Sequence, residues 1–282
     1  MYKIGIMQGR LSAPTDNRIQ FFPKDEWMME FSKAAQIGFD YIEWLYDLHD
    51  ADTNPIATDE GIKNARSLSA QYGIRIKSLC AHCFIETPLA GANDQKLNDL
   101  LKLLDWLFHR AKQLGLSRVV LPLEDATLLS NKVEFERQVA WVKKALKIAE
   151  STNIEIDLET TLEPSRFSSF LQQVPHSLLK VNYDIGNSAG MGYKIEEEFT
   201  AYGSRIGSIH IKDKILKGPT VAIGTGQADF PALARLLRQI SFDGDIVLEA
   251  ARGARGAEMS WAKRNLNFTI QQLRSFKNEE PL

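Results

Sequence analysis

The sequence predicts an α/β chain that folds as one (β/α)8 barrel of the TIM type, and three observations favour this fold. Short apolar runs rich in β-branched residues recur eight times along the chain, and amphipathic helical patterns separate most of them. The chain has 282 residues, which is close to the typical length of one such barrel. Eight βα units of this total length close most economically into a barrel, and an open doubly wound sheet is the alternative.

One unit repeats along the chain: a helical stretch, a Gly or Asn, and then an apolar run. The stop residues are Gly38, Gly73, Gly115 and, more loosely, Asn153. Glycine is expected just after a helix because it takes the left-handed conformation without a Cβ clash. The apolar run that follows suits a strand buried in a parallel sheet. The predicted strands are Lys3–Gln8, Tyr41–Trp44, Ile74–Ala81, Arg118–Leu123, Ile154–Glu159, Lys180–Asp184, Ile206–Ile211 and Asp245–Glu249.

No linker, low-complexity tract or change of composition divides the chain. We therefore predict a single barrel domain over residues 1–277 and a short polar tail over residues 278–282.

Composition and charge exclude several classes of protein. The net charge of −2 and the estimated pI of 6.2 give no basic footprint for nucleic acid. No apolar run approaches the ~20 residues that span a bilayer, and the N-terminus lacks the features of a signal peptide. Two cysteines cannot staple a secreted scaffold of this size. We expect a cytoplasmic protein that binds neither nucleic acid nor membrane.

Four consecutive predicted strands of the second half end on side chains that can bind a metal ion. These residues are Glu159, Asp184, His210 and Glu249, spaced 25, 26 and 39 residues apart, or about one βα unit each. Barrel enzymes carry their chemistry at the carboxyl ends of the strands, so the four side chains should meet at one rim. Alone, a strand-end carboxylate is commonly a helix cap, and a lone histidine is commonly a hydrogen-bonded core residue.

Four such residues on successive strands favour a shared metal site. Three carboxylates on one rim repel each other strongly unless a cation or protons offset their charge. Three oxygen donors and one imidazole suit Mn²⁺, Mg²⁺ or Co²⁺, with Zn²⁺ as a further alternative, and the donor set does not name the ion. Of these ions we expect Mn²⁺.

Several motifs around these strand ends resemble a known family. They are Tyr183–Asn187 (YDIGN), His210–Asp213 (HIKD), Gly224–Phe230 (GTGQADF), Val247–Glu249 (VLE) and Ser78–His82 (SLCAH) followed by Pro88 and Leu89. From Ile4 to Glu249 the chain resembles the xylose-isomerase-like TIM barrels of the sugar phosphate isomerase and epimerase superfamily. Within it, the chain looks most like ketose 3-epimerases of the L-xylulose-5-phosphate and D-tagatose types.

The resemblance implies a function and roles for the four residues. Glu159, Asp184, His210 and Glu249 would bind one divalent metal ion, and the two glutamates would also be the catalytic acid and base. The metal would stabilise an enediolate formed from a small sugar or sugar phosphate. One glutamate would remove the α-proton and the other would return it on the opposite face, as in a ketose 3-epimerase. The resemblance also implies a homodimer or homotetramer.

The chain departs from the tagatose-type pattern at two positions. The tagatose type has a substrate-binding histidine where this chain has Asn187, and an asparagine at this position resembles the phosphoketose type. The tagatose type also has an arginine where this chain has Leu216. Asn187 is therefore a candidate for substrate binding, and the identity of the sugar stays open.

Other polar or aromatic residues near strand ends are candidates for substrate contact. Three of these candidates have a structural alternative. It is a loop hydrogen bond for the histidine, a loop ion pair for the lysine and core packing for the tryptophan. The candidates are His82, Lys212, Glu43 and Trp44. Cys80 and Cys83 lack the further ligands of a zinc site, and we predict that they pack in the interior.

Alternative functions remain on the same barrel. Proton transfer on one face would give an aldose–ketose isomerase, and loss of a β-hydroxyl would give a lyase that dehydrates a keto compound. A barrel that keeps the metal without catalysis is the non-enzymatic alternative. An apurinic endonuclease shares this barrel, but five histidines and a charge of −2 argue against a histidine-rich zinc cluster that binds DNA.

Overall fold

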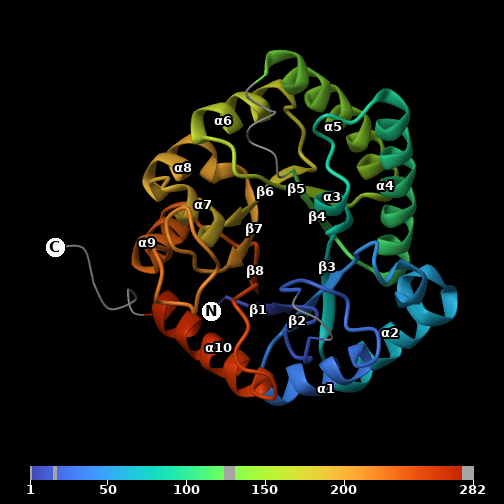
Figure 1. Cartoon of the computed structure of the whole chain (residues 1–282), viewed down its shortest axis with the longest axis vertical. Coiled ribbons are helices and arrows are strands. Elements are labelled where there is room, and N and C mark those ends of the chain that lie inside the picture. Colours follow the sequence, from blue (N-terminus) through green and yellow to red (C-terminus); the bar gives the residue numbers. More distant parts are fainter. Residues whose placement is uncertain (1, 15–17, 124–130, 275–282) are drawn as a thin grey trace.

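The strands of the protein form one closed parallel barrel. The computed structural model describes residues 2–14, 18–123 and 131–274. In this part of the chain the strand order is β1 to β8, each strand pairs in parallel with the next, and β8 pairs with β1. Figure 1 shows the strands at the centre and the helices around them. The closed order confirms the (β/α)8 barrel, and the predicted tail at 278–282 lies outside the described residues.

Every predicted strand is present, and its boundaries lie within one residue of the prediction. The strands are β1 Ile4–Met7, β2 Tyr41–Leu45, β3 Arg75–Cys80, β4 Arg118–Pro122, β5 Glu155–Glu159, β6 Leu179–Asp184, β7 Ile206–Ile211 and β8 Asp245–Leu248.

Ten α-helices are present in the described ranges and cover the outside of the barrel. They are α1 Trp27–Ile37, α2 Asp59–Tyr72, α3 Cys83–Glu86, α4 Asp94–Leu114, α5 Lys132–Thr152, α6 Pro164–Gln173, α7 Ile185–Met191, α8 Ile195–Tyr202, α9 Phe230–Gln239 and α10 Glu258–Arg274. The predicted stop residues Gly38, Gly73, Gly115 and Asn153 all have left-handed backbone conformations after α1, α2, α4 and α5.

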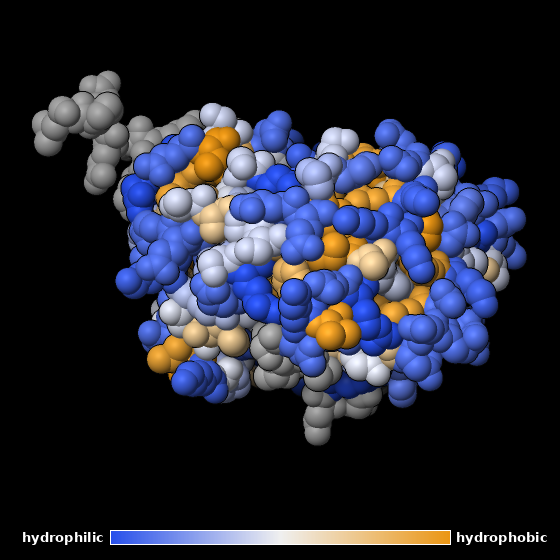
Figure 2. All heavy atoms as spheres, turned by 90° about the horizontal axis from the view of Figure 1, so that it is seen from above, coloured by the Kyte–Doolittle hydropathy of each residue, from blue (hydrophilic) through white to orange (hydrophobic). Residues whose placement is uncertain are grey.

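Most of the core lies between the strands and the surrounding helices. Three aromatic side chains form a group in this layer: Trp44 of β2, Trp27 of α1, and Phe22 from the segment before α1. The ring centroids are 5.8 Å (Phe22–Trp44) and 5.7 Å (Trp27–Trp44) apart. Hydrophilic residues cover much of the face drawn in Figure 2, with hydrophobic side chains exposed between them. In the described ranges, none of the helices combines the length and the apolar character that crossing a bilayer requires.

Two arginines cross the junction between β1 and β8, and we call this pair the arginine clasp. Arg10, from the segment after β1, donates from Nε to the Ala250 carbonyl (3.0 Å) and from Nη1 to the Ile19 carbonyl (2.6 Å). In return Arg252, which follows β8, donates to the carbonyls of Ile19 and Gly9, both at 2.9 Å. The clasp fixes the loops of the first and last strands to each other.

Candidate metal centre and active site

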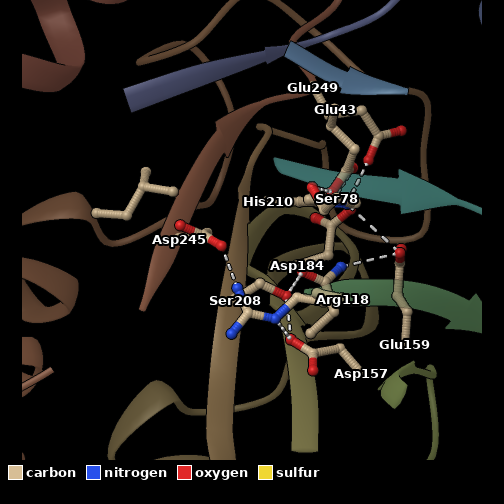
Figure 3. A network of polar contacts seen from close by, with 12 residues as sticks. Glu43, Ser78, Arg118, Asp157, Glu159, Asp184, Ser208, His210, Asp245 and Glu249 are labelled. Atoms are coloured by element: carbon tan, nitrogen blue, oxygen red, sulfur yellow. Dashed lines mark hydrogen bonds and ion pairs between the residues drawn. The ribbon is translucent and has the colours of Figure 1, made fainter. Parts of the chain in front are cut away.

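The four side chains at the strand ends meet in one cluster. Glu159 ends β5, Asp184 ends β6, His210 lies in β7 opposite Asp184, and Glu249 follows β8 directly. Each offers one ligand atom, and these atoms all lie within 4.8 Å of one another. The strand-end reasoning therefore found residues that share one rim, which Figure 3 shows from close by.

The donor set fits a divalent cation. His210 Nδ1 lies 2.8 Å from Glu249 Oε2 and 3.4 Å from Glu159 Oε2. His210 Nδ1 and Asp184 Oδ2 are both buried within the cluster, and Asp184 Oδ2 also lies 2.7 Å from Lys212 Nζ. Three carboxylates gathered in a buried site repel one another unless positive charge offsets them, and a divalent cation can supply that charge beside Lys212. Three carboxylates and one imidazole also match the hard to borderline ligands that Mn²⁺, Mg²⁺, Co²⁺ or Zn²⁺ accept.

Glu43 fixes the orientation of the His210 ring. Glu43 Oε1 lies 2.8 Å from His210 Nε2, and the Ser78 hydroxyl donates to Glu43 Oε2 at 2.6 Å. Because a carboxylate accepts, Nε2 carries a proton toward Glu43, and this contact directs Nδ1 at the cluster. A second partner of this kind is usual for a histidine that binds a metal. Glu43 was predicted to contact the substrate; its side chain is fully buried against His210, and substrate contact through Glu43 stays a prediction.

Lys212 lies inside the cluster instead of pairing with its neighbour Asp213. Its Nζ atom is 2.7 Å from Asp184 Oδ2 and 2.9 Å from Glu249 Oε1. Asp213 is buried and accepts backbone N–H groups of the loop 224–228. The loop ion pair considered for Lys212 is therefore absent, and the lysine charge is directed at the two carboxylates. Substrate contact through Lys212 stays a prediction.

Glu159 is held by two asparagine amides, one on each carboxylate oxygen. Asn187 Nδ2 donates to Oε1 at 2.9 Å, and Asn182 Nδ2 donates to Oε2 at 3.0 Å. Asn187 was a candidate for substrate binding, and the structure places its amide on Glu159. Its backbone N–H also donates to Asp184 Oδ1 at 2.9 Å. One residue thus contacts two members of the cluster.

A second layer of polar side chains lies beneath the cluster inside the barrel. The Ser208 hydroxyl lies 2.9 Å from Asn182 Oδ1 and 2.5 Å from Asp157 Oδ2. Below it, Arg118 pairs with Asp157 at 2.8 Å and with Asp245. Figure 3 labels Arg118, Asp157 and Ser208 of this layer together with Glu159 of the cluster. Burial raises the pKa of Asp157 to about 7, against the lowering effect of Arg118.

Sequence reasoning missed this layer, although a simple signal could have found it. Successive residues of a strand point to opposite faces, so the side chain two positions before an inward ligand also points inward. Asp157, Asn182 and Ser208 stand two positions before Glu159, Asp184 and His210. By the same alternation, the side chain of Trp44 points away from the barrel interior if its neighbour Glu43 points inward.

Trp44 does not reach the cluster. Its side chain is fully buried among the aromatic residues under α1, and its indole N–H donates to Asn54 Oδ1 at 3.0 Å. Its ring packs in this layer, which is the structural alternative given above, and substrate contact through Trp44 stays a prediction. His82 directly precedes α3 and is partly buried, and its role as a substrate contact stays a prediction. Cys80 and Cys83 are both buried, as predicted.

Burial and charge act against each other in the cluster. Burial by itself lowers the pKa of His210, but Glu43, Glu159 and Glu249 together raise it well above its ordinary value. Burial disfavours ionisation of Glu249, yet Lys212 and His210 hold its pKa below the usual range. Glu159 likewise has a lowered pKa despite its burial, because His210 bonds to it. These directions favour the ionised form of the two glutamates, whereas burial raises the pKa of Asp184 to about 6 against the lowering effect of Lys212.

The fold and the cluster together define the chain as a (β/α)8 barrel with a carboxylate and histidine centre at the carboxyl ends of its strands. It belongs to the xylose isomerase-like TIM barrel family, whose model matches residues 31–272.

Individual relatives in this family are distant. L-Ribulose-5-phosphate 3-epimerase from Salmonella heidelberg is 21% identical over 235 residues, covering 79% of this chain and 81% of the relative. Among solved structures, the IOLI protein with a bound zinc atom has a TM-score of 0.78 at 17% identity, over 98% of this chain and 100% of that one. L-Ribulose 3-epimerase has a TM-score of 0.76 at 16% identity, over 100% of both chains. The two structural likenesses show a shared fold.

Proposed function

We propose that this protein is a divalent-metal-dependent epimerase of a sugar or sugar phosphate, and specifically a ketose 3-epimerase. The observation that carries the proposal is the cluster of Glu159, Asp184, His210 and Glu249, whose ligand atoms lie within 4.8 Å of one another at the catalytic end of the barrel. The epimerase names of the relatives support the same reaction class.

In this proposal Asp184 and His210 are ligands only, while Glu159 and Glu249 have two tasks. A divalent cation in this site supplies Lewis-acid stabilisation of the negative charge that develops on the substrate oxygens. Glu159 has one oxygen, Oε2, on the His210 side and the other, Oε1, on the Asn187 side. Glu249 likewise directs Oε2 at His210 and Oε1 at Lys212. Each glutamate thus has a second oxygen for a proton.

The reaction would run by transfer of a proton at the carbon next to the ketose carbonyl. One glutamate removes this proton and leaves an enediolate. The other glutamate delivers a proton to the opposite face, which inverts the carbon. Lys212, buried between two carboxylates, supplies a fixed positive charge close to the substrate oxygens. Mn²⁺ is the ion that we propose first, with Mg²⁺, Co²⁺ and Zn²⁺ as alternatives.

Proton NMR in D₂O tests this function. The protein with Mn²⁺ is incubated with a panel of ketoses and ketose phosphates, and deuterium incorporation is followed at each carbon. Deuterium at C3 together with formation of the C3 epimer is the expected result. Deuterium at C1 would instead identify an aldose–ketose isomerase, and loss of water would identify a lyase. No exchange with any sugar, although Mn²⁺ binds, would favour a barrel that keeps the metal without catalysis.

A further inference from the structure

The two oxygens of the Glu159 carboxylate lie in different surroundings. Oε2 is on the side of the cluster, 3.4 Å from His210 Nδ1, and it accepts from Asn182 at 3.0 Å. Oε1 accepts from Asn187 at 2.9 Å. A carboxylate that binds a metal through one oxygen can exchange its two oxygens by rotation about its last bond, unless each oxygen is held. Here each oxygen has its own amide donor.

Both amides are themselves held at their other ends, so neither can turn over freely. Asn182 is 2% exposed, and its Oδ1 lies 2.9 Å from the Ser208 hydroxyl. Asn187 is 6% exposed, its Oδ1 lies 3.4 Å from Lys214 Nζ, and its backbone is tied to Asp184 at the start of α7. A flipped amide would direct its oxygen at the carboxylate, and two acceptors in contact repel each other.

Glu249, the other glutamate, is held differently. Its oxygens face charged groups: Lys212 at 2.9 Å, His210 at 2.8 Å and Arg10 at 3.8 Å. In the described part of the chain, only Glu159 among the three clustered carboxylates is held by side-chain amides. A change in these amides should therefore act on one glutamate and leave the other in place.

We propose that Asn182 and Asn187 are positioning residues that assign the two oxygens of Glu159 to different tasks. Asn182 holds Oε2 as the oxygen that binds the metal, and Asn187 holds Oε1 as the oxygen that transfers the proton. Ser208 supports Asn182 from the layer below. The inference rests on the proposed function for the second task, whereas the first task requires only that the cluster binds a metal ion.

The test compares Asn182→Leu with Asn187→Leu, which make the same substitution on opposite sides of the same carboxylate. Asn182→Leu should weaken Mn²⁺ binding to the metal-free protein by about 10-fold, as is usual when a partner of a ligand is lost, and calorimetric titration measures this. Asn187→Leu should change the Mn²⁺ affinity less than 3-fold but lower kcat at saturating Mn²⁺ by roughly 10- to 100-fold, given the typical size of acid–base effects.

Deuterium exchange provides a readout that a merely structural role would not move. Asn187→Leu should slow exchange at C3 more for the epimer whose proton Glu159 removes than for the epimer that Glu249 deprotonates. A loss of general stability would slow both equally. Thermal unfolding shows whether each variant is folded. If Asn182→Leu does not fold, Ser208→Ala replaces it, because loss of the Ser208 hydroxyl removes the support of Asn182 and should also weaken Mn²⁺ binding.

Equal effects of the two substitutions on Mn²⁺ affinity, or equal slowing of both epimers by Asn187→Leu, would overturn the assignment. Failure of the proposed function is distinguishable, because it would appear as an absence of exchange in the unmodified protein. The Mn²⁺ affinities of the two variants would still test the assignment of Oε2 in that case.

Discussion

His210 Nε2 and Glu43 Oε1 lie 2.8 Å apart, and both side chains are fully buried although their residues are far apart in the sequence. This contact joins β2 to β7 across the interior of the barrel. It directs the other ring nitrogen, His210 Nδ1, at Glu159 and Glu249 of the cluster.

Glu43→Gln should weaken Mn²⁺ binding. The amide can still accept from Nε2, but it removes the negative charge that makes the ring a better donor to a cation. We expect the dissociation constant to rise by about 10-fold, measured by calorimetric titration of the metal-free protein. Glu198→Gln is the matched control, because Glu198 is a buried glutamate in the helix layer. An unchanged affinity in Glu43→Gln would contradict the role of Glu43.

Glu159→Gln should stop proton transfer while the barrel stays folded. Glutamine keeps the size of the side chain but cannot accept a proton, so we expect kcat to fall by about 10²- to 10⁴-fold. Glu155→Gln, on the same strand but at the opposite end of the barrel, is the control and should keep its activity. Exchange at C3 that continues at the original rate in Glu159→Gln would refute its role as acid or base.

Removal of the metal ion should lower the thermal stability. An ion at 1,000 times its dissociation constant stabilises the folded state by about 4 kcal/mol. For a chain of this size that corresponds to roughly 10 °C in Tm. Differential scanning calorimetry before and after chelation, and again after Mn²⁺ is restored, measures the change. The Asp184→Ala variant should show almost no response to chelation, and a response equal to that of the unmodified protein would argue against the cluster as the metal site.

The buried carboxyl of Glu198 should make stability depend on pH. Burial raises the pKa of Glu198, although Tyr183, Tyr202 and Ser188 donate to it. Its protonated form is therefore favoured in the folded state, and this stabilisation is full below the unfolded pKa and is lost as pH rises through the folded value. Relative to Glu198→Gln, the unmodified protein should gain free energy of unfolding as the pH falls from 7 toward about 4. Chemical denaturation at several pH values measures this, and a difference that does not change with pH would contradict it.

The arginine clasp should contribute to stability. Arg252→Ala removes charged hydrogen bonds to the carbonyls of Gly9, Ser12 and Ile19, and we expect the free energy of unfolding to fall by about 2 kcal/mol. Arg255→Ala changes an exposed arginine of the same loop and should have little effect. Equal denaturation midpoints for the two variants would show that the clasp does not hold the loops.

The barrel and the four cluster residues could be predicted from the sequence because both follow short-range rules. Gly38, Gly73 and Gly115 mark helix ends, and each apolar run marks a buried strand. The number of βα units, eight, could therefore be predicted from the sequence. Parallel strands then bring their carboxyl ends to one rim, which placed Glu159, Asp184, His210 and Glu249 together without knowledge of the register.

Contacts across the interior could not be predicted in the same way. The partners Glu43 and His210 come from strands that are not neighbours in the barrel, and their meeting depends on its tilt and closure. Asn187 was expected to bind substrate from resemblance alone, and only the path of α7 shows that its amide reaches Glu159. The oligomeric state, the metal ion and the cellular location stay predictions.

The pairing of β8 with β1 determines when the centre can form during synthesis. Glu249 follows β8 and emerges from the ribosome after Glu159, Asp184 and His210. An unfinished chain offers three ligands on an open sheet, with no last strand to close it. We therefore expect a cation to be captured tightly only after β8 and Glu249 have been made, so that metal loading follows closure of the barrel and does not initiate folding.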